Sequence, residues 1–332
     1  MEVYYPLFFD RFRCIASACP DSCCKEWEVD VDEVAAQRYR SLEGPLGNRL
    51  RQVMKDTEDG TIMVIEEGRC PMWREDGLCR IQAELGHDAL CRVCQDFPRI
   101  CHDFGDFMEY GLELSCPEAA RLILTESHGW VVRTQPGGEE PEYDTQAMAI
   151  LRQSREVVLE FLAKTQLPAN QALEVVLLYA HQVQSWLDGA EAAQLDAEEC
   201  VALAKKYAQT GDWEPVLDFF RELEILTPQW RSRLTATEPA GKWHGGFLAL
   251  AAYFVERYWL QAVSDYDLIG RAKLAVVACL LIYRLGGDFV ETAQMFSKEI
   301  ENDPDNLVAI LDGAYTSPAL RDVLLLSLLE NG

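Results

Sequence analysis

Apolar residues recur at three- and four-residue spacing through most of the C-terminal part of the chain. This spacing gathers them on one face of an α-helix. It predicts helices at residues 147–162, 172–187, 197–208, 213–226, 247–263, 267–285, 290–301 and 319–329. No self-similarity of fixed period connects these segments, so the pattern favours an irregular helical bundle over a repeat array.

The pattern is less regular before residue 130, where turn signals at Asp59-Gly60 and Asp76-Gly77 separate short periodic segments. Helices are expected at residues 32–41 and 45–55, and from Pro117 to about residue 126, because proline suits the first position of a helix. Residues 61–66 and 107–114 are expected to be strands that pair with each other in a small β-hairpin. This part of the chain is otherwise rich in loops.

The segment at residues 135–144, Gln-Pro-Gly-Gly-Glu-Glu-Pro-Glu-Tyr-Asp, combines proline, glycine and acidic residues, which is typical of a connection between domains. It predicts a cysteine-rich metal-cluster domain at residues 1–130, a linker at 131–145 and a helical domain at 146–332. The expected fold class is mainly α, with a loop-rich, metal-binding N-terminal part followed by the helical bundle.

Composition and charge narrow the function classes. The chain has 332 residues, of which 49% are hydrophobic, so it has ample material for a packed core. Its 55 acidic residues exceed its 30 basic ones, giving a formal net charge of -25 that would repel a phosphate backbone. We therefore expect no nucleic-acid partner.

The expected location is the cytoplasm, because the N-terminal Met-Glu-Val-Tyr-Tyr-Pro has neither the basic nor the apolar region of a signal peptide. The longest apolar run, residues 272–283 interrupted by Lys273, is shorter than the roughly 20 residues that span a bilayer. No transmembrane segment is expected. The amphipathic helices leave room for a protein partner or for oligomer contacts.

Ten of the twelve cysteines lie between Cys14 and Cys116. In a reducing compartment such a concentration indicates metal ligands more often than disulfides. Nine are expected to bind metal: Cys14, Cys19, Cys23, Cys24, Cys70, Cys79, Cys91, Cys94 and Cys116. Cys101 is a doubtful tenth ligand, and Cys200 and Cys279 lie in apolar helical stretches as small buried hydrophobic residues.

The spacing of the cysteines does not identify the metal. Structural zinc sites favour paired Cys-x-x-Cys motifs, and the chain has one, Cys91 to Cys94. The common radical-enzyme spacing, begun at Cys19, would need sulfur where Glu26 stands. The composition slightly favours an iron–sulfur centre over a zinc site. Because there are more than four thiols, the sequence is compatible with two centres or with one centre and accessory thiols. A redox dithiol at Cys91 and Cys94 is disfavoured, because the preceding sequence lacks the βαβ pattern.

The segments that carry these cysteines resemble the flagellin lysine-N-methylase family. The likeness begins with Phe-Arg-Cys-Ile-Ala-Ser-Ala-Cys-Pro-Asp-Ser-Cys-Cys at residues 12–24. It continues at Trp27, Asp30 and residues 68–71, 77–81, 85–86, 90–94, 97–99 and 114–122, and two helical segments, 253–258 and 297–301, are similar as well. The cysteine block is also similar to the broader group of cysteine-rich zinc- or iron-chelating domains.

The resemblance implies methylation of lysine ε-amines on flagellin, with S-adenosylmethionine as the methyl donor and a [4Fe-4S] cluster held by the cysteines. Pro136-Gly137-Gly138 lies in the acidic connection, so the sequence offers no glycine-rich strand-to-helix loop for the donor. Arg99, Glu118 and Arg121, which adjoin cysteine motifs, are the candidate cofactor-binding residues. A purely structural role is at least as well supported, since Glu118 and Arg121 are three apart on the predicted helix.

The catalytic residues stay unassigned. A lysine amine has a pKa of about 10.4 and must lose its proton before it attacks a methyl group by displacement. Glu26, Asp30, Asp96 and Glu118 are unranked candidates for the base. Two other functions stay open: a zinc- or iron-chelating protein that delivers metal, and a methylase of this family with a substrate other than flagellin.

Overall fold

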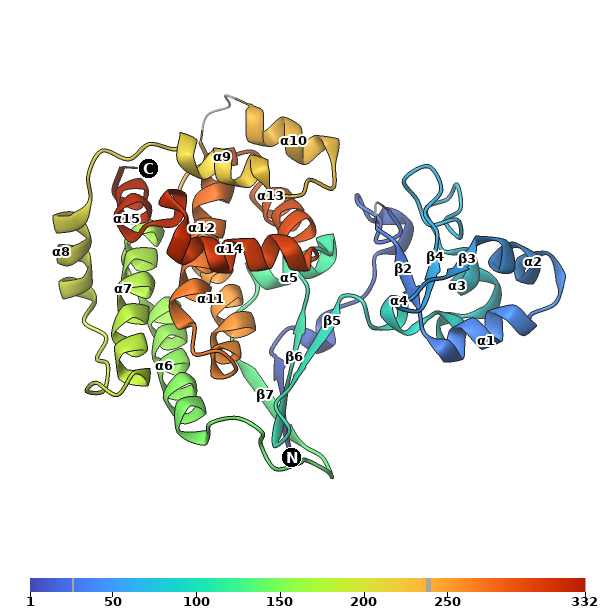
Figure 1. The fold of residues 1–332 in the computed structure, drawn as a ribbon, viewed down its shortest axis with the longest axis horizontal. Helices are drawn as coiled ribbons and strands as arrows, with labels where there is room; N and C mark the ends of the chain where they lie inside the picture. The colour runs from blue at the N-terminus through green and yellow to red at the C-terminus, as the bar shows by residue number, and fades with distance from the viewer. Residues whose placement is uncertain (26, 237–239, 332) are drawn as a thin grey trace. The chain divides into compact units, whose positions relative to one another are not determined.

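The computed structural model describes residues 1–25, 27–236 and 240–331 (Figure 1). Its contacts divide the chain into two compact units. The first, here called the helical unit, comprises Met1–Arg11, Cys101–Ser115 and the chain from Ala119 onward. The second, the cysteine-rich unit, comprises Phe12–Ile100 and Cys116–Glu118. The sequence predicts a single domain boundary, the linker at 131–145. The contacts instead group residues 1–11 and 101–115, which precede that linker, with the helical unit.

The expectation of a mainly α fold is confirmed. The helices of the N-terminal part are α1 (Glu33–Ser41), α2 (Gly44–Val53), α3 (Arg80–Leu85), α4 (Arg92–Asp96) and α5 (Pro117–Thr125). The later helices are α6 (Thr145–Lys164), α7 (Ala169–Leu187), α8 (Ala197–Tyr207), α9 (Glu214–Glu222), α10 (Pro228–Thr235), α11 (Gly246–Tyr258), α12 (Leu268–Leu285), α13 (Phe289–Phe296), α14 (Pro304–Thr316) and α15 (Asp322–Asn331).

The cysteine-rich unit contains a three-stranded antiparallel sheet in the order β2 (Val29–Val31), β4 (Thr61–Met63) and β3 (Met54–Asp56). The turn between β3 and β4 is closed by Thr57 N–H donating to Gly60 C=O at 2.7 Å. The predicted pairing of residues 61–66 with 107–114 is wrong, because β4 pairs with β2 and β3. The Asp59-Gly60 turn connects β3 directly to β4, which makes β3 the nearer partner. Strand β3 includes the last two residues of the helix predicted at 45–55, and α2 therefore ends at Val53.

Short helices pack on this sheet around a small apolar core. Asp32 begins α1 by accepting a hydrogen bond from Ala35 N–H at 3.0 Å, and Tyr39 on α1 is fully buried. The core includes two buried cysteines, and three partly buried ones, Cys24, Cys79 and Cys94, pack against it. Its buried residues are Val29, Val31, Ala35, Ala36, Tyr39, Leu46, Leu50, Val53, Met63, Cys70, Met72, Ile81, Ala89, Leu90 and Cys91. Thiols are therefore part of the packing in this unit.

A four-stranded sheet has the order β5 (Arg99–Asp103), β6 (Phe107–Leu112), β1 (Glu2–Pro6) and β7 (Trp130–Thr134). β1 runs parallel to β6 and antiparallel to β7. β7 lies at the start of the segment expected to be a linker, and its pairing with β1 joins the two ends of the N-terminal third of the chain. Strand β7 is largely exposed, which explains why its sequence gave no alternating pattern.

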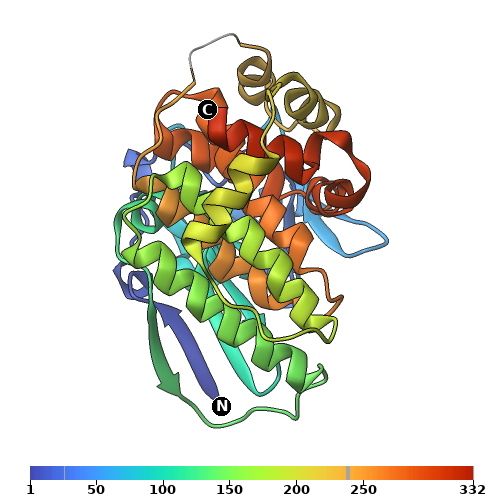
Figure 2. The ribbon, with the colours of Figure 1, turned by 90° about the vertical axis from the view of Figure 1, so that its left-hand side faces the viewer.

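The helical bundle is built around α12, which contacts α7, α11 and α14 (Figure 2). The helix predicted at 247–263 is α11 followed by a 3₁₀ turn, Trp259–Val263, and that at 290–301 is α13 followed by a π-helical turn, Ser297–Glu301. Helices α10 and α14 were not predicted. Each begins with a proline after a side-chain cap, Thr227 and Asp303 respectively, a start signal that the apolar spacing alone does not include.

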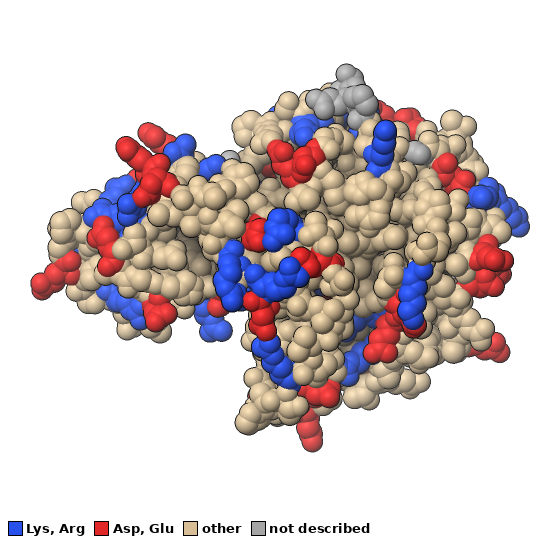
Figure 3. All heavy atoms as spheres, turned by 180° about the vertical axis from the view of Figure 1, so that it is seen from behind, with Lys and Arg blue, Asp and Glu red and all other residues tan. Residues whose placement is uncertain are grey.

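The surface carries both signs of charge despite the net charge of -25. On the face of the helical unit seen in Figure 3, acidic and basic side chains are interspersed. Arg221 with Glu214 and Asp218, and Lys164 with Glu160, are pairs of this kind. Across residues 1–25, 27–236 and 240–331, no helix has both the length and the apolar character needed to cross a bilayer.

Candidate metal centre

The first cysteine block, residues 14–24, forms a loop that carries four cysteines within a short span. The backbone makes one 3₁₀ turn, Ala16–Ala18, and then becomes extended at Cys19. The thiol of Cys19 donates to Asp21 C=O at 2.9 Å, and Cys24 N–H donates to Ser22 Oγ at 3.2 Å. These local hydrogen bonds compete with helix formation and keep the block in a loop.

The second block is held to the first by the backbone. Cys70 N–H donates to Cys24 C=O at 2.8 Å, and the adjoining residues Lys25 and Arg69 form a β-bridge. The sulfur of Cys70 is buried and lies 3.4 Å from Met63 Sδ on β4. The sheet and the two cysteine loops are thus parts of one packed structure.

Two more cysteines lie immediately before short helices. Cys79 precedes α3, and Cys91 precedes α4, which carries Cys94 in its middle. The start of α4 is fixed by Asp32, whose Oδ2 accepts from Arg92 N–H at 2.7 Å while its Oδ1 caps α1. One carboxylate therefore positions the Cys-x-x-Cys motif against α1.

All nine predicted ligands belong to the cysteine-rich unit, and they influence one another electrostatically. Cys24, Cys79 and Cys94 pack against the core that contains Cys70 and Cys91. Each of the nine acts on, or responds to, at least one other member of the set; the linked groups are Cys70 with Cys24, Cys79 and Cys91, Cys94 with Cys23 and Cys24, Cys23 with Cys14 and Cys116, and Cys19 with Cys14. The thiols from four separate segments of sequence therefore form one chain of neighbours.

Two hydrogen-bonded thiol pairs stand out within this set. The hydrogen bond between Cys23 and Cys24 raises the pKa of Cys23 and lowers the pKa of Cys24. The bond between Cys91 and Cys94 likewise lowers the pKa of Cys91 and raises the pKa of Cys94. Each pair thus loses one proton readily and holds the other, because the remaining thiol stabilises the thiolate by donating to it.

Burial works against ionisation of the other thiols. It raises the pKa of Cys70 to about 12 and is also the largest cause of the raised pKa of Cys79. A buried thiol becomes a thiolate when a cation compensates the charge, and metal binding then releases the proton. The deeper members of the set therefore need a positive partner to act as ligands.

The donor chemistry fits a thiolate-ligated metal, since all twelve cysteines are free thiols. Within the described part of the chain, no three His, Cys, Asp or Glu side chains stand close enough together to hold a metal ion. The thiols approach as pairs. A tetrahedral set would require the short loops at residues 14–24 and 70–79 to bring a second pair toward Cys91 and Cys94.

Aromatic and basic side chains border the cysteines. Trp73 lies under the guanidinium of Arg69, 4.1 Å from its ring centroid, and under the ammonium of Lys25 at 5.5 Å. Lys25 also lowers the pKa of Cys19, although burial raises it more. Sequence reasoning did not single out this Trp73 group; its signal was a tryptophan two residues after Cys70-Pro71 with basic residues on both sides.

The structure places the three candidate cofactor-binding residues in two elements. Arg99 begins β5 and lies over the ring of Phe12 at 5.1 Å. Glu118 lies in the first turn of α5, and Arg121 is an exposed residue one turn further along that helix. Cys116 directly precedes α5, as predicted from Pro117. Arg99 and Glu118 belong to the cysteine-rich unit, whereas Arg121 belongs to the helical unit.

Of the candidate bases, Asp30 is an exposed residue of β2. Asp96 is exposed at the end of α4, with Oδ2 at 3.4 Å from Arg92 Nε. Glu26 lies outside the described residues.

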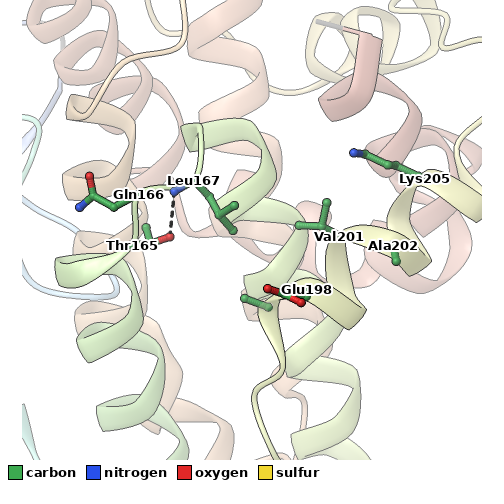
Figure 4. Close-up of a pocket in the computed structure, with 8 residues that line it drawn as sticks. Thr165, Gln166, Leu167, Glu198, Val201, Ala202 and Lys205 are labelled. Carbon is green, nitrogen blue, oxygen red and sulfur yellow. Dashed lines mark hydrogen bonds between the residues drawn. The ribbon is translucent and has the colours of Figure 1, made fainter.

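The helical unit has a separate apolar groove of about 590 Å³ between α8 and the loop before α7 (Figure 4). Thr165 Oγ1 accepts from Leu167 N–H at 3.1 Å on one side of it. Val201 and Ala202 of α8 line the other side, between Glu198 and Lys205. Its lining suits apolar side chains and offers no soft metal ligand.

Fold and site together define a mainly helical protein with a separate thiol-rich unit. Over 139 residues it is 31% identical to the flagellar biosynthetic protein FliU of Salmonella muenchen, a match that covers 38% of this chain and 79% of that protein. The chain belongs to the family of FliU and the bacterial lysine-N-methylases.

Two further relatives are named lysine-N-methylase, from Salmonella typhimurium and Salmonella choleraesuis. The chain is 34% identical to each over 133 residues, or 38% of its own length. These matches span about a third of those two proteins, 33% in each case. No family model and no solved structure matches the chain.

Proposed function

We propose that this protein is a protein-lysine N-methyltransferase that acts on flagellin in the cytoplasm before export. The relationship to proteins named lysine-N-methylase carries this proposal, and the flagellar name of FliU supports the choice of substrate. The interspersed surface charges are compatible with a protein substrate, whereas the excess of acidic residues disfavours nucleic acid.

In this proposal the methyl donor is S-adenosylmethionine, and up to four thiolates would hold a [4Fe-4S] cluster. The candidate ligands are Cys14, Cys19, Cys23, Cys24, Cys70, Cys79, Cys91, Cys94 and Cys116. The purely thiol donor set supports a cluster, with zinc as the alternative metal. When bound, such a cluster would supply iron that can hold the amino and carboxylate groups of the donor.

The protein's own groups then have defined tasks. Cys24 and Cys91 lose their protons first, because each accepts a hydrogen bond from its partner thiol. Lys25 and Arg69 beside Trp73 add positive charge near the thiolates. Arg99, Glu118 and Arg121 are the candidates to bind the donor's charged groups.

The first experiment measures metal in protein purified without oxygen. We expect brown protein with about four irons and matching acid-labile sulfide per cluster. Colourless protein with stoichiometric zinc would replace the cluster by a zinc site and favour a metal-chelating protein.

The second experiment incubates the metal-loaded protein with S-adenosylmethionine and purified flagellin and measures the mass of flagellin peptides. We expect added methyl groups on lysines. Flagellin from cells with and without the gene provides the matched comparison. If metal is present but flagellin masses stay unchanged in both settings, the flagellin assignment is wrong, and methylation of another protein would identify a different substrate within the same activity.

A further inference from the structure

The helical unit buries several charged side chains, and most of them are paired. Arg155 binds Glu109 through two hydrogen bonds, of 2.5 and 2.7 Å, with both side chains almost fully buried. His128 Nδ1 lies 3.0 Å from Glu256 Oε2, and its Nε2 lies 2.9 Å from Ile123 C=O. These pairs compensate their own charges, as buried ions normally must.

A third group is different. It gathers Glu113 after β6, Tyr253, Arg257 and Tyr258 on α11, and Glu301 at the end of the π-helical turn, and is called the Glu301 cluster below. Arg257 Nη1 lies 3.5 Å from Glu301 Oε1, and its Nη2 lies 3.8 Å from Glu113 Oε1. The cluster thus contains two carboxylates and one guanidinium, an excess of one negative charge. Burial, and then the charge of Arg257, lower the pKa of nearby His102.

The hydrogen bonds of the cluster leave acceptors free on one side. Tyr253 and Tyr258 both donate to Glu301 Oε1, at 3.0 and 2.8 Å, and Arg257 donates to the Tyr253 hydroxyl at 2.6 Å. Glu301 Oε2 is buried and has no hydrogen-bond partner among the residues described. The Glu301 side chain is 0% exposed. An ionised carboxylate oxygen in that position costs several kcal/mol unless something donates to it.

The residues around Glu301 Oε2 indicate which kind of group can donate a hydrogen bond to it. Across the described ranges, no three acidic, histidine or cysteine side chains are arranged to hold a metal ion. An alkylammonium group instead needs hydrogen-bond acceptors and a compensating negative charge, and its stem packs well on tyrosine rings. Glu301 Oε2 and the Tyr258 hydroxyl provide the acceptors, and Glu113, whose side chain is 20% exposed, is the carboxylate of the cluster that reaches the surface.

The π-helical turn is the local cause of this arrangement. Ser297–Glu301 is buried throughout, although two glutamates and a lysine are among its five residues. The wider turn brings Glu301 against α11, while Glu299 is satisfied by Leu226 N–H at 2.8 Å and Thr227 N–H at 2.9 Å. π-helical turns are uncommon and occur frequently at functional sites.

We propose that the Glu301 cluster binds the side-chain ammonium of a lysine, with Glu301 and Glu113 as its anionic partners and Tyr258 as an additional acceptor. The choice of lysine rests on the proposed methyltransferase function, whereas the preference for an ammonium group rests on the cluster itself. This assigns substrate binding to residues far from the cysteines in sequence.

The test uses the full-length, metal-loaded protein and n-butylammonium, a mimic of the lysine side chain, with neutral 1-butanol as the matched probe. Binding is measured by ligand-observed NMR. We expect wild-type protein to bind n-butylammonium at least about tenfold more tightly than 1-butanol, and Glu301→Gln to lose about tenfold of the ammonium affinity. Glu291→Gln, an exposed carboxylate on α13, makes the same charge change and should leave binding unaltered.

Folding is monitored in the same samples by melting temperature. Glu301→Gln removes the excess negative charge of the cluster and leaves Arg257 with Glu113, so its melting temperature should be kept or raised. If that variant does not fold, Tyr258→Phe replaces it and should weaken ammonium binding several-fold. Absent binding by wild-type protein, or equal binding by wild type and both cluster variants, overturns the proposal.

The outcomes also separate this inference from the proposed function. Flagellin methylation that persists fully in Glu301→Gln would overturn the cluster as the lysine site while leaving the methyltransferase assignment intact. If ammonium binding depends on Glu301 but the protein methylates no lysine, the cluster is still an ammonium-binding site. Lysine as the substrate, and with it the proposed methyltransferase function, would then be wrong.

Discussion

The two units bury very different material. In the helical unit, α12 has 18 residues and buries fifteen of them, from Leu268 to Leu285. In the cysteine-rich unit the longest described helix, α2, has ten residues and buries four. Because apolar burial contributes roughly 25 cal/mol per Å², the helical unit can be stable through packing alone. The cysteine-rich unit has less to bury and places thiols where a larger protein would place leucines.

This difference predicts that the cysteine-rich unit depends on a bound metal more than the helical unit does. Small, loop-rich structures with few buried side chains commonly gain their stability from metal or disulfides. Here the thiols are free, so metal is the available cross-link. A substitution in the cysteine-rich unit should therefore change metal content, and a substitution in the helical unit should change the stability of that unit without changing metal content.

The largest effect is expected from Cys94→Ser. Cys94 forms a hydrogen-bonded pair with Cys91, and the charges of Cys24 and Cys23 act on it as well, so its loss removes a candidate ligand that is linked to two thiols of the first block. We expect loss of bound metal and disappearance of the thermal transition of the cysteine-rich unit, with that of the helical unit retained. Metal analysis and calorimetry measure both. Cys279→Ala, at a fully buried position of α12, is the matched control and should keep its metal. Full metal in Cys94→Ser would exclude this sulfur as a ligand.

Leu280→Ala should produce the opposite separation. Leu280 is fully buried in α12, and the cavity left by alanine costs about 2–5 kcal/mol. We expect a lower denaturation midpoint for the helical unit and unchanged metal content. Val308→Ala, at a half-exposed position of α14, should change stability by less than about 0.5 kcal/mol. Metal loss in Leu280→Ala would show that the two units do not depend on separate sources of stability.

A smaller, pH-dependent effect is expected at Glu174 in α7. Burial, and then the charge of Glu330, raise the pKa of Glu174 to about 8. The folded protein therefore holds this proton more tightly than the unfolded chain, and the stability it contributes at low pH is lost as pH rises through about 8.

Glu174→Gln mimics the protonated form at every pH. Its stability should be close to that of wild type near pH 5 and exceed it by about 2 kcal/mol near pH 9, after allowance for screening by Lys205. Melting temperatures across this range measure the effect, and Glu160→Gln, a fully exposed residue of α6, is the control. A difference that is constant with pH would show that Glu174 does not titrate in this window.

Sequence reasoning worked where one force dominates. Apolar spacing predicted α6, α7, α12 and α15, because each presents a continuous apolar face to the bundle. It missed α10 and α14, whose Pro and cap signals are local, and it paired residues 61–66 with the wrong strand. Strand pairing also depends on the turns that connect the strands, and the apolar pattern alone does not identify the partner.

The candidate site shows the same limit. The cysteine spacing predicted a thiol-rich region, and the structure places the nine thiols in one unit, but whether they bind metal stays a prediction. The Glu301 cluster was not predicted at all, because Glu113, Arg257 and Glu301 are distant in sequence and meet only through β6, α11 and the π-helical turn. The sequence feature that could have indicated it is a set of charged residues inside otherwise apolar helical segments. The spacing of apolar residues does not use these positions.

The smallest effect is expected from Cys101→Ala. Cys101 is an exposed residue of β5 in the helical unit, where Tyr110 and Asp103 are its electrostatic neighbours. We expect unchanged metal content and a stability change below about 0.5 kcal/mol. Cys116→Ala is the matched variant: Cys116 is buried, belongs to the cysteine-rich unit and acts on Cys23, so iron content should fall. If Cys101→Ala loses metal and Cys116→Ala keeps it, the doubtful tenth cysteine is a ligand, and membership of the cysteine-rich unit does not decide which thiols bind.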